Sequence, residues 1–231
     1  MTRPSAAPAG TTKGADIVKK LLVAITLGLA SLSAAAQQPP DEFVREAAEL
    51  LDGAVTERRQ ELASDRDALY ELIDEILLPR FDRRYAAQLV LGRHWRTASE
   101  TQREQFIDAF YRSLLRQYAD GLLEFDLSKL KILTYRGDES KPRTVVRTTV
   151  ELDDGTITPV DYGLVKHDSG WQVFDVTNEG ISYVRNFRAE FNAEIQAKGL
   201  DAVIQRLQRE AQQPPEAAGE ASETGQTAGA E

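Results

Sequence analysis

The residues best suited to acid–base chemistry are two aspartates, Asp161 and Asp175, which fall on neighbouring segments with strand-like alternation. Two carboxylates that face one cavity can act as general acid and general base when their environments separate their pKa values. Aspartate is depleted in strands, so each residue has a local reason for its position. A hydrogen bond that fixes a loop or a helix end is the commoner reason. The alternative to this structural role is an enzyme that uses Asp161 or Asp175 as its general base.

Other patterns that mark a catalytic or metal site are missing from the sequence. It has no glycine-rich phosphate loop, no G-x-S-x-G nucleophile motif and no H-E-x-x-H zinc motif. It has no cysteine, which excludes disulfides, thiolate chemistry and cysteine-ligated metals. Its two histidines, His94 and His167, are far apart in sequence, whereas a metal site needs three or four convergent ligands. We expect no metal, no cofactor and no catalytic residue.

Residues 1–36 have the three parts of a secretory signal peptide. A basic stretch ending in Lys19-Lys20 precedes the uncharged apolar stretch 21–32, and Ala34-Ala35-Ala36 provides the small residues of a cleavage site. The apolar stretch is shorter than the roughly 20 residues that span a bilayer. No cysteine follows it, so lipid attachment there is excluded. We expect cleavage after Ala36 and a secreted, soluble mature chain.

The mature chain would be strongly acidic. Residues 1–36 hold four bases and one acid, so the remainder keeps 24 bases and 36 acids, a formal charge of −12. Nucleic-acid binding depends on neutralising phosphates with basic residues, and anionic lipid surfaces attract basic clusters. The charge therefore argues against a nucleic-acid partner and against permanent residence on a membrane surface.

Residues 212–231 read as a disordered tail. They contain no Leu, Ile, Val or aromatic residue, and Pro214-Pro215 ends the preceding helix. Such a segment cannot bury enough apolar area to offset the entropy lost on ordering. The folded part is therefore expected to be a single domain over residues 37–211. No heptad repeat is present, and we expect a monomer.

Between leader and tail, the hydrophobic periodicity changes from helix to strand and back. Helices are predicted after an N-cap at Asp41, from Ser64 or Asp65 to Pro79, over 81–91, and behind a Ser99–Gln102 capping box. Strands are predicted over 130–135, 145–152, 160–164 and 171–178, with turns at Asp154-Gly155 and Asp168-Ser169-Gly170. Helices return after Gly180 and Gly199. The pattern predicts an α+β fold with an antiparallel sheet of about four strands covered by helices.

Two ordered blocks of motifs carry a resemblance that spans residues 41–208. The first block contains LLPRFD (77–82), LVLGRHWR (89–96) and QREQF (102–106), and the second contains GWQVFDV (170–176), EGIS (179–182) and KGLD (198–201). Together they resemble the MlaC, or toluene-tolerance, family of periplasmic proteins. Asn178 departs from this pattern, because an aliphatic residue is expected there.

The resemblance implies an NTF2-like fold with an elongated apolar cavity between sheet and helices. It also implies a soluble phospholipid carrier without enzymatic activity, which holds the acyl tails inside and leaves the headgroup near solvent. The implied partners are an outer-membrane lipoprotein–porin complex and the MCE-domain subunit of an inner-membrane ABC transporter, between which lipid moves to maintain outer-membrane asymmetry. The alternative is an NTF2-like enzyme that acts on an apolar small molecule.

The apolar stripes supply candidates for the cavity wall. The predicted lipid-binding residues are Phe106, Phe110, Leu114, Val146, Val150, Tyr162, Leu164, Val184, Phe187 and Phe191. An apolar stripe at helical spacing is also what an ordinary core helix requires, so each residue has a purely structural alternative. The predicted headgroup or partner contacts are Arg93, Arg96, Arg143, Arg147 and Lys166. An arginine fork can donate hydrogen bonds to a phosphate, although a solvated charge is the alternative.

Overall fold

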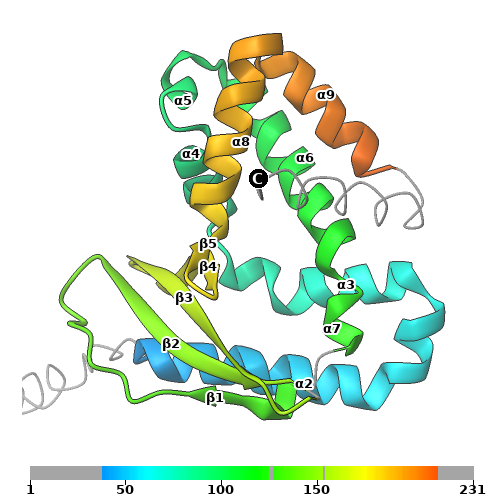
Figure 1. Cartoon of the computed structure of the whole chain (residues 1–231), viewed down its shortest axis with the longest axis vertical. Coiled ribbons are helices and arrows are strands. Elements are labelled where there is room, and N and C mark those ends of the chain that lie inside the picture. Colours follow the sequence, from blue (N-terminus) through cyan, green and yellow to red (C-terminus); the bar gives the residue numbers. More distant parts are fainter. Residues whose placement is uncertain (1–37, 125–126, 153, 213–231) are drawn as a thin grey trace, which may run out of the picture. The chain divides into compact units, whose positions relative to one another are not determined.

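The structure, a computed structural model, describes residues 38–124, 127–152 and 154–212. The predicted signal peptide, 1–36, and the predicted tail beyond Gln212 lie outside these residues. In the described part, helices come first, antiparallel strands follow, and two helices close the chain (Figure 1). The α+β fold class is therefore confirmed. The sheet has five strands, because a two-residue strand adds to the four that were expected.

The front helices begin and end near the positions that the sequence predicts. They are α2 (Pro40–Ser64), α3 (Arg66–Ile76), the 3-10 turn η1 (Leu78–Arg80), α4 (Arg83–Leu91) and the short α5 (His94–Thr97). Asp65, one of the two cap positions that the sequence offers, caps α3 by accepting from the Ala68 N–H. Asp41 lies in the first turn of α2 rather than at its cap. Its negative charge there still interacts favourably with the positive end of the helix dipole.

The helix α6 (Glu100–Tyr118) carries the predicted capping box. The Gln102 N–H donates to Ser99 Oγ at 3.2 Å, and the Ser99 N–H donates to Gln102 Oε1 at 3.0 Å. Two backbone N–H groups at the start of the helix, which have no acceptor within it, are thereby hydrogen-bonded. The short α7 (Gly121–Glu124) and η2 (Leu127–Lys129) lead from α6 to the sheet.

The sheet is an antiparallel meander in the order β1-β2-β3-β4-β5. The strands are β1 (Leu130–Ile132), β2 (Arg143–Glu151), β3 (Ile157–His167), β4 (Gly170–Asn178) and β5 (Ile181–Ser182). The register places Val146, Tyr162 and Val176 side by side. Because side chains alternate between faces, their neighbours Arg147, Asp161 and Thr177 share the other face. We call these the inner and outer faces.

Two helices complete the fold after the sheet. The helix α8 (Tyr183–Lys198) is capped by Ser182, whose hydroxyl accepts from the Arg185 N–H at 3.1 Å. Gly199, with φ of 84°, separates α8 from α9 (Leu200–Glu210), as the sequence predicts. A positive φ strains residues with a Cβ, which explains glycine at this junction. The helix α9 packs on α6, and α8 packs on α4 and β4.

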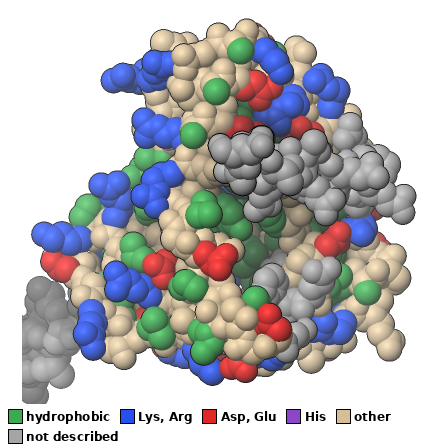
Figure 2. All heavy atoms as spheres, viewed as in Figure 1, with side chains coloured by type: hydrophobic (Ala, Val, Ile, Leu, Met, Phe, Trp, Pro, Cys, Tyr) green, Lys and Arg blue, Asp and Glu red, His purple; other side chains and the backbone are tan. Residues whose placement is uncertain are grey.

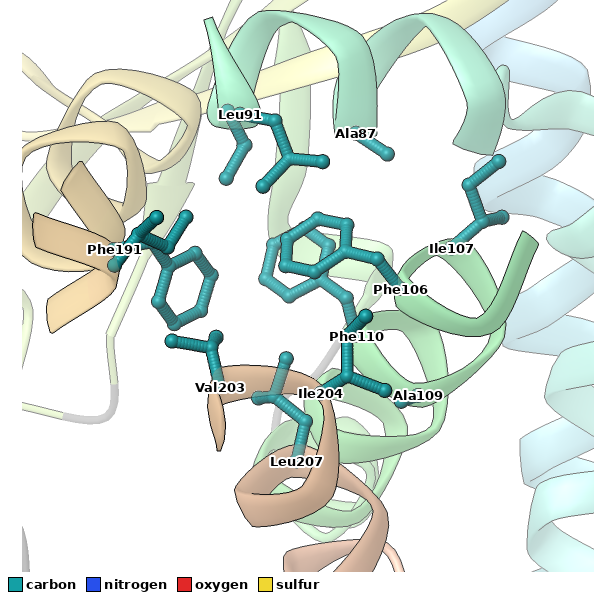
Figure 3. Packing of buried hydrophobic residues seen from close by; sticks show 12 residues of the cluster. Ala87, Leu91, Phe106, Ile107, Ala109, Phe110, Phe191, Val203, Ile204 and Leu207 are labelled. Carbon is teal, nitrogen blue, oxygen red and sulfur yellow. The ribbon is translucent and has the colours of Figure 1, made fainter. Parts of the chain in front are cut away.

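The buried hydrophobic residues form three separate clusters. The helical cluster joins α4, α6, α8 and α9 around Phe106, Phe110 and Phe191 (Figure 3). A second cluster joins α2 and α3 around Leu62 and Leu69. The sheet cluster places Val146, Leu164, Trp171 and Val173 of the inner face against Val44 near the start of α2. In the described part of the chain, no helix is long and apolar enough to cross a membrane.

Candidate functional site

The margins of the three clusters carry apolar side chains that are only half-buried. Leu114, Val184 and Phe187 lie at the margin of the helical cluster, Leu115 and Leu123 at that of the second cluster, and Tyr162 and Val176 at that of the sheet cluster. Leu114 and Leu115 are adjacent on α6, so the first two margins meet there. Figure 2 shows hydrophobic side chains gathered in a recess near the centre of one face, in the region where Figure 1 has the lower ends of α6 and α8.

A row of aromatic rings leads from the buried helical cluster to the surface. Ring centroids are 5.2 Å apart for Phe110 and Phe187, 6.3 Å for Phe187 and Tyr183, and 5.6 Å for Tyr183 and Tyr118. Tyr118 ends the row with 42% of its surface exposed. Burial nevertheless raises the pKa of its phenol, and Tyr183 adds to the effect. The row of rings therefore extends from the buried cluster, at Phe110, to the protein surface, at Tyr118.

Tyr162 provides the matching feature on the inner face of the sheet. Burial alone raises the pKa of its phenol to about 12, and its hydroxyl makes no hydrogen bond with any other described residue. Even so, Tyr162 is only half-buried by accessible surface. The raised pKa and the remaining accessible surface are consistent with a ring that has protein around it but keeps one side uncovered. Tyr162 packs at the margin of the sheet cluster, and its place on a cavity wall stays a prediction.

Asn178 lies on the same face of the sheet as Tyr162. It pairs with Val160 across β3 and β4, two residues from the Tyr162–Val176 pair, and so is a diagonal neighbour of Tyr162. Its Oδ1 is buried and has no hydrogen-bond partner. Most buried polar groups are hydrogen-bonded, so an unpartnered carboxamide oxygen on this face is unusual.

The predicted lipid-binding residues divide into two groups. Phe106, Phe110 and Phe191 contact one another inside the helical cluster, with ring centroids 5.4 to 5.6 Å apart (Figure 3). Val146 and Leu164 are fully buried in the sheet cluster, and Val150 is 9% exposed. Leu114, Tyr162, Val184 and Phe187 keep accessible surface at the cluster margins. Lining of a cavity stays a prediction for the whole set, and this last group is the best placed for it.

The predicted headgroup or partner contacts are not brought together. Arg93 and Arg96 are exposed around α5. Arg143 and Arg147 are exposed on β2 at outer-face positions, where Arg143 donates to Tyr85 Oη at 3.2 Å. Lys166 donates to the Glu139 carbonyl at 3.0 Å and lies over the Trp171 ring. Their role in headgroup or partner contact stays a prediction.

The two candidate catalytic aspartates lie at outer-face positions. Asp161 pairs with Arg147 and Thr177. Asp175 accepts from Ser182 Oγ at 2.6 Å and from the Val184 N–H at 3.0 Å. It therefore fixes the start of α8, which is the structural explanation that the sequence favoured.

No group of three metal-ligating side chains occurs within the residues that the structure describes. The histidines are separate: His94 Nε2 lies 3.1 Å from Asn192 Oδ1, and His167 Nε2 lies 2.9 Å from Asp82 Oδ2.

A cleft of about 320 Å³ lies on another side of α6, towards α3, and has a different character. Its lining is mixed in charge and includes Asp74, Asp108 and Arg112. Tyr111 donates to Asp74 at 2.6 Å, and Arg112 pairs with Asp108 at 3.1 Å. These charged groups pair with one another, whereas the buried Tyr70 hydroxyl in the same lining has no partner; this polar lining makes the cleft a poor site for an apolar ligand.

Tyr118, Tyr183 and Asn178 were not among the predicted lining residues. The signal for the tyrosines is present in the sequence, because Tyr118 extends the apolar i+4 stripe of α6 and Tyr183 begins the aromatic i+4 stripe of α8. Asn178 was noticed only as a departure from the family pattern. Its lack of a partner depends on which strand lies beside it, and sequence periodicity does not report that.

Comparison with known proteins identifies relatives along most of the chain. Toluene tolerance protein ttg2D of Pseudomonas putida is 28% identical over 187 residues, which cover 80% of this chain and 86% of the relative. The intermembrane phospholipid transport system binding protein MlaC of Haemophilus influenzae is 24% identical over 197 residues, covering 84% and 92%.

A solved structure has the same fold. It is that of a phospholipid-binding protein from Ralstonia solanacearum in complex with a phospholipid, with a TM-score of 0.69 and 23% identity over 75% of this chain and 97% of that one. The profile of the MlaC protein family matches residues 45–209, well over half of the sequence. The chain belongs to the MlaC protein family.

Proposed function

We propose that this protein binds a phospholipid in an apolar recess at the margins of the helical and sheet clusters, and carries it through the periplasm without catalysing a reaction. The observation that carries the proposal is the group of half-buried side chains at the cluster margins, which comprises Leu114, Val184, Phe187 and Tyr162. The names of the Haemophilus relative and the Ralstonia structure, which both refer to phospholipid, support the ligand class.

The energetics of acyl-chain transfer suit a carrier of this kind. Two chains hold about 30 methylenes, each worth about 0.8 kcal/mol on leaving water. Their sum, on the order of 24 kcal/mol, exceeds what non-covalent affinities reach. Transfer from a membrane into an apolar recess exchanges one apolar medium for another, so its net free energy can be near zero. A carrier therefore needs no nucleotide site of its own, and its partners set the direction of transport.

The proposed route follows from the family. The donor and acceptor would be an outer-membrane lipoprotein–porin complex and the MCE-domain subunit of an inner-membrane ABC transporter, and the traffic would maintain outer-membrane lipid asymmetry. A mature charge of −12 favours a carrier that leaves anionic membrane surfaces readily. The predicted signal peptide would deliver the chain to the periplasm.

The test measures phospholipid in mature protein that is purified from bacteria without detergent. Organic extraction should recover phospholipid from the wild type. Tyr118→Glu places a carboxylate at the open end of the aromatic row and should lower occupancy roughly tenfold, because burying an unpaired charge beside acyl chains is costly. Val145→Glu is the matched control, since Val145 is 50% exposed at an outer-face position of β2. Equal occupancy in both variants, at wild-type circular dichroism, would contradict the proposal.

A further inference from the structure

The cleft between α3 and α6 contains a buried hydroxyl that has no partner. Residues of α3, η1, α4 and α6 line the cleft, together with Ala211 directly after α9. The hydroxyl of Tyr70, on α3, is buried in this lining and makes no hydrogen bond within the described residues. Buried hydroxyls are normally hydrogen-bonded, because leaving one unsatisfied costs free energy. The Tyr70 hydroxyl therefore marks a point at which the cleft can bind a polar group.

The neighbours of this hydroxyl show that the missing partner is an acceptor. Arg116 lies over the Tyr70 ring, 5.7 Å from its centroid. The pKa of Arg66 is raised chiefly by its hydrogen bond with Asp120 and further by Tyr70, so Arg66 also lies near this phenol. A guanidinium group donates hydrogen bonds and cannot accept them. These two cations consequently offer no acceptor to the Tyr70 O–H.

Arg83, at the start of α4, is a second donor in the lining. Its side chain is half-buried, and its guanidinium lies over the Tyr111 ring, 5.0 Å from the centroid. It makes no hydrogen bond or ion pair with any other residue that the structure describes. Stacking on a ring orients a guanidinium and leaves the N–H groups at its edge available. Arg83 can therefore donate to a ligand in the cleft.

The three carboxylates of the lining do not supply the missing acceptor. Asp74 accepts from the Tyr111 hydroxyl at 2.6 Å, and Asp108 accepts from Arg112 Nε at 3.1 Å. Asp67 is exposed to solvent in the first turn of α3. The half-buried side chains that keep unused hydrogen-bonding groups in the cleft are thus both donors. Two donors beside a further cation are suited to an oxyanion.

We infer that this cleft is a second binding site, separate from the proposed lipid recess, for a small anion that carries a carboxylate or a phosphate. Tyr70 and Arg83 donate hydrogen bonds to the oxygens of the anion, and Arg116 adds positive charge at the Tyr70 end. A volume of about 320 Å³ lies near the lower end of the range of small-molecule sites, roughly 300–1,000 Å³. The ligand is accordingly a compact solute.

The test titrates citrate and inorganic phosphate, in separate experiments, into the mature protein at constant ionic strength and measures binding by isothermal titration calorimetry. One saturable site is expected for at least one of these anions, and their relative affinities distinguish a carboxylate site from a phosphate site. Choline chloride, a cation of similar size, should show no binding. Tyr70→Phe should weaken anion binding roughly tenfold, the loss expected when one hydrogen bond to a charged group is removed. Arg83→Gln should weaken it at least as much.

Tyr135→Phe and Arg147→Gln are the matched controls. The Tyr135 hydroxyl already lies 2.8 Å from Thr144 Oγ1, and Arg147 is exposed at an outer-face position of β2. Both variants should bind the anion as the wild type does. The absence of saturable binding in the wild type would overturn the inference. So would a Tyr70→Phe variant with wild-type affinity, or control variants that lose as much affinity as Tyr70→Phe.

Two further measurements separate a ligand site from a structural role. Tyr70→Phe should leave the thermal midpoint of the anion-free protein unchanged or raised, because no protein hydrogen bond is lost. A lowered midpoint would reveal an acceptor inside the protein and overturn the inference. Tyr70→Phe and Arg83→Gln should also retain the phospholipid occupancy of the wild type. A parallel loss of phospholipid would overturn the separate site and leave the carrier function standing.

Discussion

Asp175 accepts hydrogen bonds from Ser182 Oγ and from the Val184 N–H, and through them joins the end of β4 to the first turn of α8. The sequence could only weigh this structural role against a catalytic one, because Ser182 and Val184 are local neighbours whose direction depends on the turn between them. Glu179, with φ of 49°, and Gly180, with φ of 82°, form that turn. The chain there turns back far enough for one carboxylate to reach both donors.

Replacement of Asp175 by alanine should destabilise the protein without affecting lipid affinity. The variant leaves the buried Ser182 hydroxyl and the Val184 N–H without their acceptor, so the free energy of unfolding should fall by about 1–3 kcal/mol. Urea denaturation measures the change. Asp161→Ala is the control and should have a smaller effect. An unchanged midpoint for Asp175→Ala, or lost activity on an apolar substrate without lost stability, would favour the alternative enzyme.

At the scale of elements, the helix ends were the most predictable feature. Asp65, the Ser99–Gln102 pair and Gly199 each act where the sequence places them, because capping depends on side chains within three residues of the helix end. The exposure of the apolar helix faces was less predictable. Phe106 and Phe187 both follow helical spacing, but Phe106 is fully buried and Phe187 is only half-buried. Periodicity identifies a buried face and does not report whether that face meets another.

The α8–α9 pair contains a pH-dependent contact. Arg206 on α9 donates to Glu194 on α8 at 2.7 Å, and these hydrogen bonds hold the pKa of Glu194 below its usual value of 4.5. The contact therefore stabilises the folded protein above that value and is lost as the pH falls through the lowered pKa. Glu194→Gln should lower stability at pH 7 and flatten its fall in acid. Chemical denaturation at a series of pH values measures both effects.

Glu190 supplies a comparison of opposite sign on the same helix. Burial raises its pKa, although Arg206 acts in the other direction. Its protonation therefore favours the folded state, so this residue opposes the acid loss caused by Glu194. Glu190→Gln should remove a gain in stability that the wild type shows above pH 4.5, as the pH falls through the raised pKa of Glu190. Parallel pH profiles for Glu190→Gln and Glu194→Gln would contradict this assignment.

At the scale of the whole molecule, the described residues bury their apolar side chains in three clusters, and the half-buried margins carry the proposed function. Composition and periodicity predicted the fold class, because helical and strand periods differ along the chain. They could not predict the separation of the clusters, which depends on the distance between sheet and helices. That expectation came from the resemblance of motifs such as GWQVFDV (170–176) to a family.

The most direct test of the central claim offers lipid-free mature protein to vesicles of a single defined phospholipid and then measures the protein by native mass spectrometry. We predict a shift in mass equal to bound phospholipid, with retention of the native charge-state distribution. Protein that remains at its lipid-free mass after incubation, while still folded by circular dichroism, would contradict the account.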